Sequence, residues 1–228
     1  MKAGIETRNM NEKNNKDKDR IGEIISRLQE KYPVATCALE YESEAYKLLI
    51  MARLSAQCTD ARVNIVAEDL FERFRSLEDF AEAELEELEK AVFSCGLYKT
   101  KAKNIKAMCR MMIDEFDSKV PKTMEDLLKL PGIGRKIANL IIGDIFGKPA
   151  IVADTHCIRI SNRLSLCDSE NPHTVEKQLA AIIPPEESSD FCHRLVYFGR
   201  ECCTARSPKC EKCFLKDLCE FEKQKQQN

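Results

Sequence analysis

The amino-acid sequence has no long apolar run. Across its 228 residues, no uninterrupted apolar stretch reaches the roughly 18 residues of a membrane-spanning helix. The N-terminus also lacks the apolar segment of a signal peptide. These absences argue against a membrane protein and against a secreted one. We therefore expect a cytoplasmic protein that has no membrane partner.

Runs in which apolar and polar residues alternate between turns are missing as well. Apolar residues instead recur at helical spacing, as in Ile24, Ile25 and Leu28. This pattern predicts an all-α architecture, and the length suffices for one large or two small cores. Residues 1–18 are polar and rich in Asn, Lys and Asp, so we expect them to form a mobile tail.

The net charge of −2 gives no hint of a nucleic-acid partner, but the charges are unevenly distributed. Residues 67–90 hold ten acids and three bases, whereas residues 97–136 hold ten bases and five acids. The bases include Lys99, Lys101 and Lys103. Such an asymmetric field can orient a DNA duplex, although a solvated helix face would give the same pattern.

Twelve cysteines without a secretory signal argue against a disulfide framework. Four of them near the C-terminus have the spacing of metal ligands, C-x6-C-x2-C-x5-C: Cys203, Cys210, Cys213 and Cys219. Four thiolates can hold a zinc ion or a [4Fe–4S] cluster, and the spacing alone does not decide between them. Cys202 adjoins Cys203 and could be mistaken for the first ligand.

A Gly-x-Gly turn lies between two apolar helical runs and predicts a helix-hairpin-helix over 124–147. Its residues are Gly132, Ile133 and Gly134, followed by Arg135 and Lys136. Glycines permit close approach of a phosphate, and the N–H groups that open the second helix form an anion site. The lysine offers an amine nucleophile. A plain helix–helix turn with an exposed lysine is the alternative.

Eighteen residues after Lys136 the chain reads Asp154-Thr155-His156. The Asp154 carboxylate could accept a proton and stabilise positive charge, and it could equally serve as a helix N-cap. His156 could orient Asp154, satisfy a buried network or contact DNA.

These elements together resemble the endonuclease III family of helix-hairpin-helix DNA glycosylases, from about Ile21 to Cys219. The segments Leu54-Ser55-Ala56-Gln57-Cys58-Thr59-Asp60 and Gly96-Leu97-Tyr98 add to the resemblance. It implies an all-α, two-lobed helix-hairpin-helix DNA glycosylase fold with a C-terminal four-cysteine iron–sulfur loop. The implied parts are a polar tail (1–18), a helical barrel lobe (38–148), an iron–sulfur lobe (19–37 plus 149–220) and a second tail (221–228).

The resemblance further implies a bifunctional DNA glycosylase and abasic-site lyase of base excision repair. Such an enzyme removes oxidised pyrimidines from double-stranded DNA through a Schiff base on Lys136, with Asp154 as the second catalytic residue. Gln57 and Leu97 would probe the gap that the extruded base leaves, although Gln57 could instead cap a helix and Leu97 could lie in the core. The expected partner is duplex DNA with damaged bases or abasic sites. The expected state is a monomer, associated with the nucleoid in a bacterium.

For the four cysteines, the resemblance favours a [4Fe–4S] cluster with a structural role. It also supplies two alternatives for the whole protein. A mismatch glycosylase of the same superfamily, for adenine or thymine, generally lacks the lysine and carries a further C-terminal domain, while here nine residues follow Cys219. A non-catalytic iron–sulfur DNA-binding or redox-sensing protein would need no lysine–aspartate pair.

Four positions depart from the commonest family pattern. They are Ile137, Gly143-Asp144 and Ala153. Because these residues lie close to the predicted catalytic residues, the sequence specifies the preferred lesion less firmly than it specifies the reaction.

Overall fold

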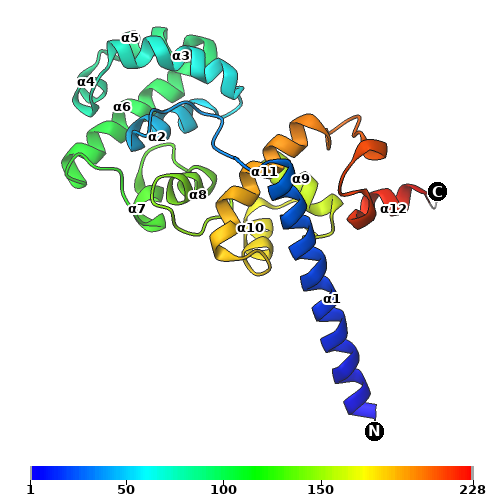
Figure 1. The fold of residues 1–228 in the computed structure, drawn as a ribbon. Helices are drawn as coiled ribbons and strands as arrows, with labels where there is room; N and C mark the ends of the chain where they lie inside the picture. Colours follow the sequence, from blue (N-terminus) through cyan, green and yellow to red (C-terminus); the bar gives the residue numbers. More distant parts are fainter. Residues whose placement is uncertain (1, 227–228) are drawn as a thin grey trace. The chain divides into compact units, whose positions relative to one another are not determined.

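The structure is a computed structural model that describes the backbone of residues 2–226 and the side chains of residues 17–223. Every regular element within residues 2–226 is helical (Figure 1), which confirms the predicted all-α class. None of the helices in this part of the chain is long and apolar enough to cross a membrane.

The chain divides into two compact units. One is Cys37–Lys148, and the other combines the N-terminal part of the chain up to Thr36 with Pro149 and the residues after it. The assignment of a barrel lobe to 38–148 and of an iron–sulfur lobe to 19–37 plus 149–220 stays a prediction.

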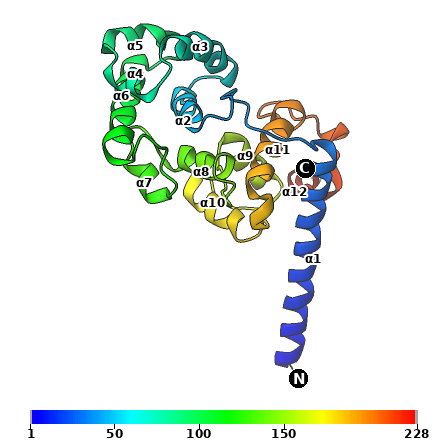
Figure 2. The same cartoon turned by 60° about the vertical axis from the view of Figure 1, so that its left-hand side comes forward.

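The unit Cys37–Lys148 contains seven α-helices and one short 3-10 helix within its described residues. They are α2 (Ala45–Leu54), α3 (Asp60–Arg73), α4 (Leu77–Glu82), α5 (Leu85–Ala91), η1 (Phe93–Cys95), α6 (Tyr98–Glu115), α7 (Met124–Lys129) and α8 (Arg135–Asp144). Helix α2 packs against α3, α6 and α8 (Figure 2). Because five consecutive residues of α2, Leu48 to Ala52, are buried, α2 forms the centre of this core.

The other unit is built around α9 and α11. Its elements are α1 (Lys2–Lys31), α9 (Thr155–Arg163), α10 (Pro172–Ala180), η2 (Pro185–Glu187), α11 (Ser188–Glu201), η3 (Cys210–Lys212), η4 (Lys216–Leu218) and α12 (Glu220–Gln226). Helix α11 packs against α9 and against α1. Their contact buries apolar side chains such as Leu28, Ile160, Leu195 and Phe198.

The two segments predicted as tails fall largely within helices. Residues 2–18 belong to α1, and residues 221–226 belong to α12. A helical backbone does not by itself test mobility, so the mobile tail (1–18) and the second tail (221–228) stay predictions. Side chains before residue 17 and after residue 223 lie outside the described residues.

Candidate active site and cysteine loop

The Gly-x-Gly segment forms a tight connection between α7 and α8. Helix α7 begins after Thr123, whose side chain accepts a hydrogen bond from the backbone N–H of Asp126 at 3.1 Å. The connection turns back on itself where the N–H of Ile133 donates to the carbonyl of Leu130 at 3.1 Å. Gly134 is the N-cap of α8. The predicted helix-hairpin-helix is therefore present, and the first N–H groups of α8 have no acceptor within the helix.

Gly132 is required by both its backbone and its neighbours. Its φ of 80° lies in the left-handed region, and a Cβ at this position would lie 2.6 Å from Arg53 Nε. The Asn104 amide, oriented with its oxygen toward the guanidinium, accepts from Arg53 Nη2 at 3.1 Å and from Arg53 Nε at 3.3 Å. The side chains of Arg53 and Asn104 therefore pack against the hairpin at Gly132. By contrast, Gly134 has a φ of −106°, and a Cβ there would meet nothing within 4 Å.

The hairpin presents Lys136 at its surface. Lys136, Arg135, Gly132 and Gly134 are all exposed, as an amine or phosphate contact requires. Ile133 differs, because its side chain is buried in the core. Any contact that Ile133 makes with DNA would therefore come from its backbone.

Asp154 is the N-cap of α9, as its position in the sequence predicted. Its Oδ1 accepts from the backbone N–H of Cys157 at 2.7 Å, and its own N–H donates to the carbonyl of Val152 at 2.8 Å. The side chain is half-buried. Asp154 belongs to the unit that contains Pro149 and the residues after it, whereas Lys136 belongs to the unit Cys37–Lys148.

His156 belongs to a polar network, one of the three roles considered for it. Its Nδ1 lies 3.2 Å from Arg159 Nη2, and that nitrogen donates to the carbonyl of Cys203 at 2.9 Å. Helix α11 passes directly against this pair, since a Cβ on Gly199 would lie 2.8 Å from Arg159 Nη2. Arg159 thus joins α9 to the cysteine loop. Arg159 was not predicted from the sequence, although it lies one turn beyond Thr155.

Gln57 and Leu97 are exposed loop residues with unusual backbone. Their φ angles are 55° and 46°, both left-handed, and Leu97 is 57% exposed. The two alternatives considered for them are wrong. Leu97 does not lie in the core, and Gln57 caps no helix, because the C-cap of α2 is Ser55 and the N-cap of α3 is Thr59.

Lys101 corrects the view of residues 97–136 as one basic surface. Its side chain is fully buried, and its Nζ donates to the carbonyls of Leu54 and Cys95, both at 2.8 Å. Burial lowers the pKa of this lysine. Lys101 therefore cannot face DNA. Its position on the same helical face as Ile105 and Met108 was the signal that could have revealed this.

The four predicted ligands line one hollow. Cys203, Cys210, Cys213 and Cys219 all line it, together with apolar neighbours that include Phe198 and Leu215. Among the residues that the structure describes, no three His, Cys, Asp or Glu side chains form a group that could hold a metal ion. Four cysteine thiols around one hollow fit an iron–sulfur cluster in donor chemistry. Cys202 lines the same hollow, so the geometry does not separate it from the four.

Arg163 holds the start of the cysteine loop. Its Nη1 lies 3.3 Å from Cys203 Sγ and donates to the carbonyl of Thr204 at 2.8 Å, while Nη2 donates to the carbonyl of Ala205 at 2.9 Å. The Arg163 guanidinium therefore lies directly beside the sulfur of the first predicted ligand. This role of Arg163 was likewise not predicted from the sequence.

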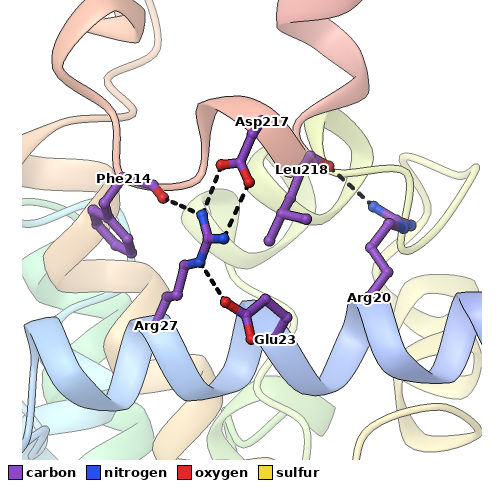
Figure 3. A network of polar contacts seen from close by, with 6 residues as sticks. All are labelled: Arg20, Glu23, Arg27, Phe214, Asp217 and Leu218. Atoms are coloured by element: carbon purple, nitrogen blue, oxygen red, sulfur yellow. Dashed lines mark hydrogen bonds and ion pairs between the residues drawn. The ribbon is translucent and has the colours of Figure 1, made fainter.

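Helix α1 holds the far end of the loop (Figure 3). Arg27 forms a bidentate pair with Asp217, at 2.7 and 3.0 Å, and donates to the carbonyl of Phe214 at 2.9 Å. Two helical turns earlier, Arg20 donates to the carbonyl of Leu218 at 3.2 Å. A segment near the N-terminus thus fixes the loop that carries the last two cysteines.

Two family models match the chain. Residues 50–185 match the HhH-GPD superfamily of base excision DNA repair proteins. Residues 203–219 match the iron–sulfur binding domain of endonuclease III. The second match begins at Cys203 and ends at Cys219, and it confirms the [4Fe–4S] cluster as the cofactor.

Curated relatives and solved structures agree with the family models. Endonuclease III of Bacillus subtilis (strain 168) is 42% identical over 196 residues, which cover 86% of this chain and 89% of that protein. Endonuclease III of Escherichia coli (strain K12) is 37% identical over 200 residues, covering 88% and 94%. A solved non-covalent endonuclease III–DNA complex matches with a TM-score of 0.87 and 43% identity, covering 92% of this chain and 99% of that one.

A second solved structure, a trapped endonuclease III–DNA covalent intermediate, matches with a TM-score of 0.87 and 44% identity, covering 92% and 98%. A thermostable thymine-DNA glycosylase is 23% identical with a TM-score of 0.80 and shows the shared fold alone. With relatives this similar over nearly their whole length, the chain belongs to the endonuclease III family of helix-hairpin-helix base excision repair proteins.

Proposed function

We propose that this protein is a bifunctional DNA glycosylase and abasic-site lyase that removes oxidised pyrimidines from double-stranded DNA, with Lys136 as its nucleophile. The observation that carries the proposal is the exposed Lys136 amine at the start of α8, beside the N–H groups of the Gly132–Gly134 turn. Lysine can attack the sugar C1′ and form an iminium, which activates the sugar for β-elimination of the 3′ phosphate.

Lys136 must lose a proton before it attacks. The ordinary pKa of lysine is about 10.4, so a proton acceptor or removal from water has to favour the free amine. We assign the acceptor role to Asp154. Only its Oδ1 is used by the helix cap, which leaves Oδ2 for the proton. In the transition state the same carboxylate would stabilise the positive charge on the sugar.

The turn would hold the DNA backbone. Backbone N–H groups at the start of α8 and the exposed Arg135 offer donors and positive charge to a phosphate. Gln57 and Leu97 would fill the gap left by the extruded base, one as a polar probe and one as an apolar wedge. Their exposure supports these roles.

When bound by Cys203, Cys210, Cys213 and Cys219, a [4Fe–4S] cluster would cross-link the cysteine loop and so have a structural role. The loop between its ligands exposes Arg206, Lys209 and Lys212, and we propose that they contact DNA phosphates. We also propose a cytoplasmic location, where a reducing environment would suit twelve cysteines that form no disulfide.

Incision of defined duplexes tests the proposal. The substrates carry an oxidised pyrimidine, an abasic site, a mispaired adenine or a mispaired thymine. Strand nicking in the absence of added alkali separates lyase action from simple removal of the nucleobase. We expect the first two to be cut, Lys136→Gln to abolish nicking, and Lys148→Gln, an exposed lysine of the same unit, to retain it. Base release without nicking, or a preference for a mispaired base, would instead favour the mismatch glycosylase.

A further inference from the structure

The turn that carries Leu97 exposes a second large apolar side chain, that of Phe93. Phe93 is 62% exposed and Leu97 is 57% exposed, and only three residues separate them. Single exposed apolar side chains are ordinary on a protein surface. Two of them in one short turn form an apolar patch, which marks a surface that a partner covers.

The 3-10 helix η1 explains why Phe93 faces solvent. Its register is set by Val92 and Cys95, which are 0% and 2% exposed. The N–H of Gly96 donates to the carbonyl of Phe93 at 3.3 Å. Residues three apart lie on the same side of a 3-10 helix, so Phe93 and Gly96 share the side away from the core. Since Gly96 has no side chain, nothing from that position covers the Phe93 ring.

The Phe93 ring is supported on one side by the rest of the turn. Its centroid lies 4.8 Å from that of the Tyr98 ring, with 53° between the two planes. Between these two residues, the carbonyl of Cys95 accepts from the buried Lys101 Nζ at 2.8 Å. The ring therefore has a defined position before any partner binds, which lowers the entropy cost of binding.

The charges near the ring do not indicate an ionic ligand. Exposed Lys90 and Lys99 flank Phe93 in the sequence, while exposed Glu87 belongs to α5, which packs against η1. A phenyl ring offers neither a charge nor a hydrogen-bond donor to a phosphate. It can stack on a nucleobase, because every base has a π-face.

Duplex DNA is the partner of this family, as in the endonuclease III–DNA complex described above. We propose that Phe93 stacks on a nucleobase that borders the gap left by the extruded base, beside the Leu97 side chain. The proposal rests on the proposed function, because it takes Leu97 as the residue that enters the gap. The patch formed by Phe93 and Leu97 is then one continuous apolar contact with the distorted duplex.

This contact has a physical purpose in the reaction. Extrusion of a nucleotide costs unstacking energy, because the bases beside the gap lose a stacking partner. An aromatic ring beside the wedge would replace part of that stacking whichever base it meets. Phe93 should therefore strengthen binding to DNA with an extruded or missing base more than binding to intact duplex. The contact neutralises no phosphate, so the salt dependence of binding should stay unchanged.

Fluorescence of Phe93→Trp tests the stacking directly. The chain contains no tryptophan, so the introduced indole is the only one. Binding of a duplex with a stable abasic-site analogue should quench its emission, whereas the emission of Ile65→Trp should not respond. Ile65 is 59% exposed and lies outside the loops proposed to contact DNA. An unquenched indole in Phe93→Trp, with the duplex shown to be bound, would overturn the proposal.

Affinity measurements test the contribution of the ring to binding. Phe93→Ala should bind the abasic-analogue duplex about 5-fold or more weakly than wild type, with less effect on intact duplex and no change in the salt slope. Phe93→Trp should retain wild-type affinity because it keeps an aromatic face, and Ile65→Ala should match wild type. Wild-type affinity in Phe93→Ala would assign the exposed ring to a partner other than DNA and refute the stacking.

Removal of single nucleobases locates the contact. Each base beside the abasic analogue is deleted in turn on either strand, and wild type is compared with Phe93→Ala. At the position where Phe93 stacks, the two proteins should bind equally well, since either change alone removes the interaction. A difference that persists at every flanking position would contradict stacking beside the gap.

Leu97→Ala and nicking by wild-type protein separate this inference from the proposed function. Weaker binding by Leu97→Ala together with wild-type binding by Phe93→Ala would refute only the role of Phe93. A wild-type protein that neither nicks abasic DNA nor prefers it to intact duplex would refute the proposed function itself.

Discussion

Replacement of Gly132 by alanine should destabilise the hairpin. The backbone at this residue has a φ of 80°, and a Cβ would lie 2.6 Å from Arg53 Nε and even closer to the Asn104 amide. Gly134, two residues later, has ordinary backbone and open space around it. The two glycines of one motif therefore have different physical roles, and the same substitution at Gly134 is the matched control.

The magnitude follows from two terms. A non-glycine residue in left-handed backbone costs about 1–2 kcal/mol. The atoms that a Cβ would strike belong to flexible side chains, so they can move, but moving them breaks the hydrogen-bonded pair of Arg53 and Asn104, which contributes about 1 kcal/mol. Gly132→Ala should thus lose about 2–3 kcal/mol, and Gly134→Ala should change the free energy of unfolding by less than about 0.5 kcal/mol.

Thermal unfolding followed by circular dichroism at the helical signal measures this difference. For a protein of this size, about 2–3 kcal/mol corresponds to a decrease in Tm of roughly 4–12 °C. Nicking of abasic DNA by both variants would show separately whether either glycine matters for substrate. A Gly132→Ala variant as stable as wild type, or a Gly134→Ala variant equally destabilised, would refute the argument from backbone and contact.

Three further predictions have defined outcomes. Asp154→Asn should keep the helix cap, because asparagine caps as well as aspartate, yet it should lower turnover about 100-fold. If the variant loses its activity because its folding stability falls, Asp154 has only a structural role. Anaerobically purified protein should contain about four iron atoms per chain, lost in Cys203→Ser and kept in Cys202→Ser; the reverse would shift the ligand set by one residue. Lys101→Met should destabilise the protein by about 2 kcal/mol or more, since two buried carbonyls lose their donor, whereas Lys99→Met at an exposed position should not. Equal stability of the two variants would contradict a stabilising role for the two buried hydrogen bonds of Lys101.

The fold was predictable because its signals are local. Helical periodicity identified the all-α class, and the turn glycines marked the hairpin, where Gly132 indeed needs left-handed backbone. The N-cap role of Asp154 also followed from the residues beside it. These features depend on neighbours within about one helical turn, so the sequence alone carries them.

The supports of the site were not predictable in the same way. Arg53 and Asn104 meet beneath Gly132 from two other helices, and Arg159 and Arg163 reach from α9 to the loop some forty residues later. Such contacts depend on tertiary packing, which a single sequence does not display. Lys101 shows the opposite error, because counting charge along the chain treated a buried residue as surface.

Borohydride trapping on abasic duplex DNA tests the central claim, that the Lys136 amine attacks the sugar. Reduction of the iminium should give a stable protein–DNA adduct whose cross-linked peptide carries Lys136. The adduct should be absent from Lys136→Gln and present at wild-type yield in Lys148→Gln. A trapped adduct of wild-type yield in Lys136→Gln, or an adduct mapped to another amine, would contradict the assignment.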